Sequence, residues 1–154
     1  MRMRRRYVED SMLKLLLPVD GSASAVNATR KLVDTLAWYR ATPSIELCTV
    51  HLPLPRMGNV GAFVSKEMVQ KYYDDESDKM LAPSRKLLDA AGVAYTVQRL
   101  VGQIAESIVE RANASGVDMI FMGTRGMSPL ANMAMGSVAT RVVHLAHVPV
   151  VLVH

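Results

Sequence analysis

Short apolar runs alternate with segments of helical periodicity along most of this chain. Aliphatic and β-branched runs are typical of buried strands, whereas apolar residues at spacings of three and four line one face of a helix. The pattern predicts strands over residues 13–19, 45–51, 93–101, 118–123 and 148–153. It predicts helices over residues 22–40, 64–91, 102–116 and 137–146. Pro83 lies inside the second of these, and we favour one helix that bends there over a second helix that begins there.

The order of these elements determines the expected fold class. Strands and helices alternate, and four of the five strand runs are almost wholly apolar, which suits strands buried on both faces. The sequence therefore predicts an α/β fold, a five-stranded parallel sheet with helices on both faces joined by right-handed crossovers. Ligands of such sheets bind beyond the carboxyl ends of the strands, so the loops that lead from strand to helix are the segments to search.

Length and charge limit the domain organisation and the partners. A chain of 154 residues fits one core, and we expect residues 1–11 to form a basic disordered tail and residues 12–154 to form one domain. The tail supplies about half of the net charge of +4, and the remaining chain has no basic helix face. We therefore expect no nucleic-acid binding. No run approaches the ~20 apolar residues of a membrane span, and we expect a cytoplasmic protein without membrane contact.

Residues 123–137 are the loop with the most informative chemistry. Gly123 and Gly126 allow the backbone to turn tightly and to approach a ligand closely. Gly136 and Ser137 stand at the head of a helix, where unpaired N–H groups, the helix dipole and a hydroxyl suit a phosphate, and Arg125 adds positive charge. The residues alone leave a second interpretation open, in which these glycines form only a turn and a helix cap.

The spacing of this loop is Gly, two residues, Gly, nine residues, Gly and Ser, and it resembles the nucleotide loop of the ATP-binding branch of the universal stress protein family. The resemblance extends to residues 15–21, 101–102, 118–126 and 149–153. It covers nearly everything from Met12 onward, except residues 52–79, which vary in the family.

The resemblance implies a Rossmann-like fold of the adenine nucleotide alpha hydrolase type that binds ATP with Mg²⁺ or Mn²⁺. It also implies a symmetric homodimer that forms through the C-terminal strand. The residues that would bind the nucleotide are Pro18, Val19, Asp20, Val101, Gly102, Gly123, Arg125, Gly126, Gly136, Ser137 and Val138. Asp20 would also help to place the divalent cation, although an Asp-Gly pair is equally a common turn former.

Three functions fit these residues. The chain is a regulatory switch whose ATP-bound state an unknown protein partner recognises, a slow ATPase or autophosphorylating protein that modifies Ser128 or Ser137, or an interaction protein of the same fold without a nucleotide. The intact glycine pattern argues against the third function. No motif supplies a catalytic base or nucleophile, which argues against the second. The sequence does not choose between ATP and other adenine nucleotides such as AMP or cyclic AMP.

Overall fold

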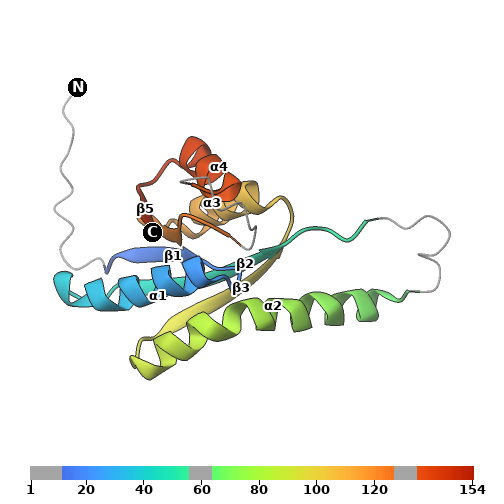
Figure 1. Ribbon diagram of the computed structural model, residues 1–154, viewed down its shortest axis with the longest axis horizontal. Coiled ribbons are helices and arrows are strands. Elements are labelled where there is room, and N and C mark those ends of the chain that lie inside the picture. The colour runs from blue at the N-terminus through green and yellow to red at the C-terminus, as the bar shows by residue number, and fades with distance from the viewer. Residues whose placement is uncertain (1–11, 56–63, 127–134) are drawn as a thin grey trace.

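Five parallel strands form one sheet, as predicted, and their order is β3–β2–β1–β4–β5 (Figure 1). The computed structural model describes residues 12–55, 64–126 and 135–154. The predicted basic tail and the middle of the glycine-rich loop, including Ser128, lie outside the described residues. The strands are β1 (Lys14–Pro18), β2 (Ser44–His51), β3 (Tyr95–Val101), β4 (Met119–Gly123) and β5 (Val150–Val153).

Four α-helices connect the strands, and their positions follow the apolar periodicity of the sequence. They are α1 (Ala23–Thr35), α2 (Lys66–Ala90), α3 (Ile104–Ser115) and α4 (Ser137–Leu145). A single helix, α2, runs through Pro83, so the alternative of a second helix is wrong. The α-helix predicted to reach residue 40 ends at Thr35 and continues as the short 3₁₀-helix η1 (Leu36–Trp38).

The helices cover the two faces of the sheet in pairs. Alternate side chains of β1 show this, because Leu15 and Leu17 belong to the core formed with α1 and α2, whereas Leu16 belongs to the core formed with α3 and α4. All three leucines are fully buried, and each such burial stabilises the fold by about 2 kcal/mol. This two-sided burial is the reason that β1 reads as a continuous apolar run.

The strand order reverses between β1 and β4. From β1 the chain proceeds outward through β2 to β3, and it then returns to the other side of β1 to form β4 and β5. The carboxyl ends of β1 and β4 are therefore neighbours, and the loops that follow them begin at Val19 and Thr124. This point of an α/β sheet is where ligands characteristically bind.

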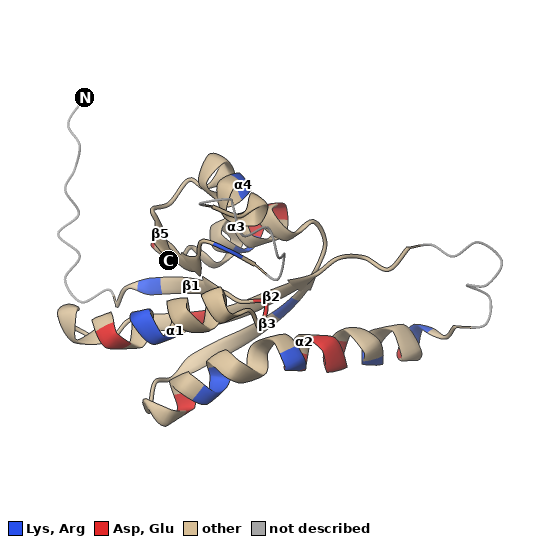
Figure 2. Ribbon diagram, viewed as in Figure 1, with Lys and Arg blue, Asp and Glu red and all other residues tan. Residues whose placement is uncertain are grey.

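Charged side chains are distributed over the described helices without segregation by sign. Both signs of charge occur toward each end of α2 (Figure 2). In the described part of the chain no helix combines the length and the apolar character needed to cross a membrane.

A half-buried ion pair connects β2 to α3. The Arg111 guanidinium donates to both carboxylate oxygens of Glu46, at 2.6 and 2.8 Å, and the Ser115 hydroxyl donates to the same carboxylate at 3.0 Å. The hydrogen bonds from Arg111 hold the pKa of the Glu46 carboxyl below its ordinary value. A lowered folded pKa means that the pair stabilises the fold above the unfolded pKa and that this contribution is lost as the pH falls through the folded value.

We predict that Glu46→Gln lowers the free energy of unfolding at pH 7 by about 1–3 kcal/mol, because Arg111 loses its ionic partner. The loss should be smaller at pH 3 than at pH 7, because the contribution of the ionised carboxyl is lost as the pH falls toward its lowered folded pKa. Urea unfolding at the two pH values measures this difference. Glu110→Gln, a change of the same charge at an exposed position of α3, is the matched control. An equal loss at both pH values would contradict the prediction.

Candidate functional site

The loop between β1 and α1 is a tight turn built by Asp20, Gly21 and Ser22. One carboxylate oxygen of Asp20 accepts a hydrogen bond from the Ser22 backbone N–H at 2.9 Å, and the Ser22 hydroxyl caps α1 by accepting from Ala25 N–H at 3.1 Å. Gly21 has a φ of +80°, and a Cβ there would lie 3.3 Å from Cα of Met80 in α2. The turn thus requires glycine for its backbone conformation and for its close approach to α2.

The second carboxylate oxygen of Asp20 faces the other loop. A Cβ built on Gly126 would lie 3.1 Å from that oxygen. Gly126 is exposed, and its φ lies outside the left-handed region. The absence of a side chain at Gly126 therefore leaves open surface beside a carboxylate, at the point where the strand order reverses.

Gly123 has a different role from Gly126. It is buried at the end of β4, and a Cβ there would lie 2.8 Å from both the carbonyl carbon and the carbonyl oxygen of Ser24 in α1. The Ser24 hydroxyl in turn accepts a hydrogen bond from the Arg125 backbone N–H at 3.2 Å. Gly123 makes room for the first turn of α1, and Ser24 then fixes the start of the loop. That Gly123 also surrounds a phosphate stays a prediction.

Thr124 joins the two ends of the glycine-rich loop. Its side chain is 2% exposed, and its carbonyl accepts from the Gly136 N–H at 2.6 Å. A Cβ on Gly136 would lie 3.2 Å from that carbonyl oxygen and 3.7 Å from the Gly126 nitrogen. Glycine at position 136 therefore allows the returning chain to lie directly against residues 124–126. Residues 127–134, between these two ends, lie outside the described part of the chain.

The loop leads into the N-terminus of α4. Gly136 is the N-cap residue and provides no capping side chain, so helix geometry leaves the N–H groups of the first turn without intrahelical acceptors. The Ser137 side chain is exposed beside these groups, and Val138 is half-buried against the core. Together with the helix dipole, these donors favour an anion at this position.

The remaining predicted residues lie at the same edge of the sheet, but most of their backbone N–H groups are absent or already used in hydrogen bonds. The Val19 N–H already donates to the Cys48 carbonyl at 2.8 Å, and Pro18 has no N–H, so neither supplies an N–H donor to a ligand. Gly102 donates its N–H to the His51 carbonyl at 2.9 Å, and Val101 is 50% exposed beside it. This places the Val101–Gly102 turn across β2 from the Asp20 turn.

The His51 side chain at the end of β2 contacts α2. Its ring packs edge-on against Tyr72 and Tyr73 of α2, with ring centroids 5.7 and 5.5 Å apart. These aromatic contacts account for the position of the ring at the end of β2.

The described residues contain no group of three or more His, Cys, Asp and Glu side chains able to enclose a metal ion. A phosphate-bound Mg²⁺ does not need such a group, because it takes one or two carboxylates and retains several waters. One oxygen of Asp20 is used within its own turn and the other faces Gly126. The donor set at this edge thus fits a cation that arrives with phosphates and does not fit an all-protein metal site.

Two residues of the site were missed by sequence reasoning. Ser24 contacts Arg125 across 101 positions of sequence, and Thr124 lies within the loop but has neither the flexibility of glycine nor a charge. Spacing patterns cannot reveal contacts of this kind, because they depend on which strands become neighbours.

The fold is that of an α/β protein, and an acidic turn, a glycine-rich loop and a helix N-terminus meet where its strand order reverses. The chain belongs to the universal stress protein family, whose family model matches residues 12–154.

Relatives of known name and structure agree with this assignment. The chain is 29% identical to the universal stress protein MJ0531 of Methanocaldococcus jannaschii, over 96% of this chain and 85% of that protein. It is similar to the solved structure of protein MJ0577, with 26% identity, a TM-score of 0.74, and coverage of 91% of this chain and 94% of that one. A universal stress protein solved in complex with cAMP has the same fold, with 21% identity, a TM-score of 0.67, and coverage of 94% and 99%.

Proposed function

We propose that this protein binds ATP at the edge where β1 and β4 end and that it acts as a nucleotide-dependent regulatory switch in the stress response. The observation that carries the proposal is the approach of Asp20 to Gly126 beside the N-terminus of α4. A carboxylate that places a cation, a backbone without side chains and a row of N–H donors are the groups that a phosphate chain requires.

In this proposal the residues divide by the part of the ligand that they contact. The backbone at Pro18 and Val19 and the Val101–Gly102 turn border the adenine and ribose. Arg125, Gly126, Gly136, Ser137 and Val138 surround the phosphates, and Asp20 orients Mg²⁺ or Mn²⁺ through its second oxygen. Gly123 contributes indirectly, because it allows α1 and the loop to pack together.

The choice among adenine nucleotides depends on the phosphate end. One related protein of the same fold binds cAMP, which lacks a phosphate chain. The N-terminus of α4 and the positive charge of Arg125 favour a longer anionic ligand in this chain, because both interactions increase with the charge of the ligand.

Calorimetric titration of nucleotide-stripped protein with ATP and Mg²⁺, followed by a phosphate-release assay on the same sample, tests the proposal. We expect micromolar binding with negligible turnover. Steady phosphate release would favour the slow ATPase, and radiolabel retained on Ser137 would favour autophosphorylation. Absence of binding to ATP, AMP and cyclic AMP would overturn the proposal in favour of an interaction protein without a nucleotide.

We further propose a homodimer that forms through β5, because the two edges of the sheet differ in chemistry. The β3 edge carries Arg99, which forms an ion pair with Asp78 of α2, and a charge of this kind opposes strand pairing. The β5 strand is Val-Val-Leu-Val, and all four residues remain partly exposed. An uncharged, aliphatic edge of this kind is suited to pairing with a second copy.

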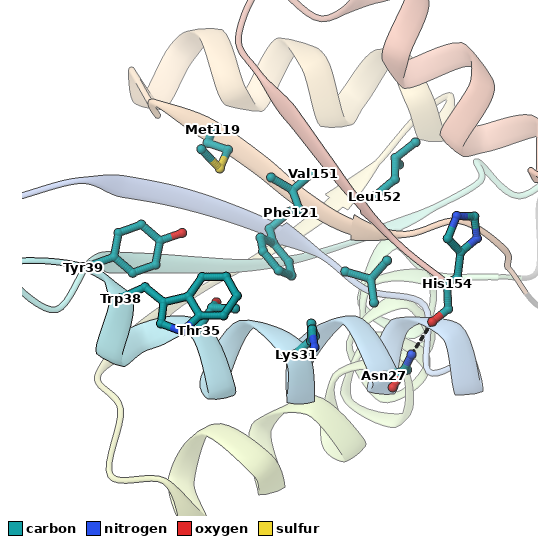
Figure 3. A pocket seen from close by; sticks show the side chains of 11 residues that line it. Asn27, Lys31, Thr35, Trp38, Tyr39, Met119, Phe121, Val151, Leu152 and His154 are labelled. Carbon is teal, nitrogen blue, oxygen red and sulfur yellow. Dashed lines mark hydrogen bonds between the residues drawn. The ribbon is translucent and has the colours of Figure 1, made fainter.

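A groove of about 510 Å³ adjoins this edge between α1 and β5 (Figure 3). Phe121, Val151 and Val153 form its apolar floor, and Trp38 stands at its rim with 79% of its surface exposed. The apolar surface therefore continues from the β5 edge into the groove, and a second copy paired on β5 would cover it. Such coverage is favourable because it removes apolar area from water.

We predict that Val151→Lys raises the dissociation constant of the dimer by about 100-fold or more, because it places an unpaired charge at the covered edge. Sedimentation velocity over a concentration series measures this constant. Trp38, the only tryptophan, provides a second signal, since its fluorescence should shift to the blue as the dimer forms. Thr96→Lys, the same charge at an exposed position of the β3 edge, is the control and should leave the dimer intact.

A further inference from the structure

We propose that Thr124 is a positioning residue that couples nucleotide binding to pairing of the β5 edge. The inference rests on the proposed function and adds a regulatory connection between its two parts. Thr124 follows β4 directly, begins the glycine-rich loop and lies beside the last residues of β5. It therefore belongs to both the nucleotide site and the edge strand.

The hydrogen bonds of Thr124 make this connection. Its backbone N–H donates to the Val153 carbonyl at 2.9 Å, and its carbonyl accepts from the Gly136 N–H at 2.6 Å. Its hydroxyl shares a hydrogen bond with Nδ1 of His154 at 3.4 Å. One buried residue thus holds the end of β5 on one side and the closing end of the loop on the other.

Helix α1 forms hydrogen bonds to both the end of β5 and the start of the loop. The Asn27 side-chain amide donates to the backbone oxygen of His154 at 2.5 Å, as Figure 3 shows. Ser24, three positions earlier in the same helix, accepts from the Arg125 N–H in the loop. The end of β5, the first turn of α1 and the start of the loop are consequently joined by a continuous set of hydrogen bonds.

The inward hydrogen bonds of β5 leave its outer edge free for a partner. The carbonyls of Pro149 and Val153 accept from β4 and from Thr124, so the alternation of a strand directs the backbone groups of Val150 and Leu152 to the open edge. A second copy paired there would restrict the motion of β5, and through Thr124 it would restrict the two described ends of the loop, residues 124–126 and 135–137. The dimer would then lose less conformational entropy than the monomer when it binds nucleotide.

Coupling of this kind is reciprocal. If the dimer binds ATP more tightly than the monomer does, ATP must strengthen the dimer correspondingly. We expect saturating ATP to lower the dissociation constant of the wild-type dimer about tenfold, a typical size for coupling between two sites.

The test compares dimer dissociation constants by sedimentation velocity with and without saturating Mg-ATP. Thr124→Val retains the buried shape and removes the hydroxyl, and we expect the ATP-induced shift to fall below about threefold. Thr140→Val is the matched control, because its hydroxyl donates to the Gly136 carbonyl at 2.9 Å in the same loop rather than to a residue of β5. It should retain the wild-type shift. Should Thr124→Val not fold, His154→Ala removes the same contact from an exposed position and should reduce the shift in the same way.

The outcomes separate this inference from the proposed function. A wild-type protein that binds ATP and dimerises, but whose dissociation constant does not respond to ATP, overturns the coupling alone. Equal shifts in Thr124→Val and Thr140→Val overturn the role of Thr124. Failure of the wild-type protein to bind any adenine nucleotide, or to dimerise, overturns the proposed function and the inference with it.

Discussion

Replacement of Gly126 by valine is expected to weaken ATP binding by about 10- to 100-fold while leaving the stability of the fold nearly unchanged. A side chain at this position meets the Asp20 carboxylate and fills the surface where the phosphates would lie. The loss corresponds to one or two charge-assisted hydrogen bonds that the ligand no longer reaches. The backbone itself tolerates the change, because Gly126 is exposed and its φ lies outside the left-handed region.

Calorimetric titration with Mg-ATP and a thermal melt of the same sample measure both halves of this expectation. Ala114→Val, which adds aliphatic bulk at an exposed position of α3, controls for a general effect of the substitution. Wild-type affinity in Gly126→Val would show that the nucleotide does not approach this loop. A large drop in melting temperature would instead show that Gly126 supports the fold.

Replacement of Gly123 by valine should, in contrast, mainly lower the stability of the fold. The first added atom would lie 2.8 Å from the backbone of Ser24, which cannot move without displacing α1 from the sheet. Overpacking of this kind costs about 3 kcal/mol or more of folding free energy. We expect ATP affinity to fall as well, but only as a consequence of the damaged fold.

Urea unfolding of Gly123→Val beside Gly126→Val tests this assignment, because the two glycines belong to one motif and differ only in what surrounds them. Ser24→Ala, which removes the hydroxyl that accepts from Arg125 N–H, should lie between the two and cost about 1 kcal/mol of stability. If both glycine variants lost affinity without losing stability, Gly123 would be a ligand contact and the packing role would be wrong.

The sequence predicts the elements well where burial is the dominant force. Runs such as residues 15–17 are apolar because helices cover both faces of the strand, so periodicity alone identifies them. The prediction fails at the end of α1, because the helix expected to reach residue 40 ends at Thr35 and Trp38 lies exposed on the 3₁₀ turn that follows. A large aromatic side chain carries no local signal of whether a partner covers it.

The glycine-rich loop shows a second limit of sequence reasoning. Its three glycines are equivalent in the motif, yet Gly123 accommodates a helix, Gly136 accommodates the loop itself, and Gly126 alone opens onto the edge of the sheet. These differences depend on the neighbours that the fold supplies. Thr124 is similarly ordinary in sequence, and it gains its contacts to Val153 and His154 only because β5 pairs with β4.

The long helix α2 divides into two parts that should differ in local stability. With 25 residues it is about 37 Å long, and its N-terminal part extends beyond the sheet (Figure 1). Its buried residues, from Ser77 to Leu88, all lie in the C-terminal part. Amide hydrogens before Ser77 should therefore exchange through local fraying, whereas those near Leu81 and Leu88 should exchange only when the domain opens as a whole. A bound ligand would slow amide exchange in the second part. The exchange rates in the first part would stay unchanged and would serve as an internal reference.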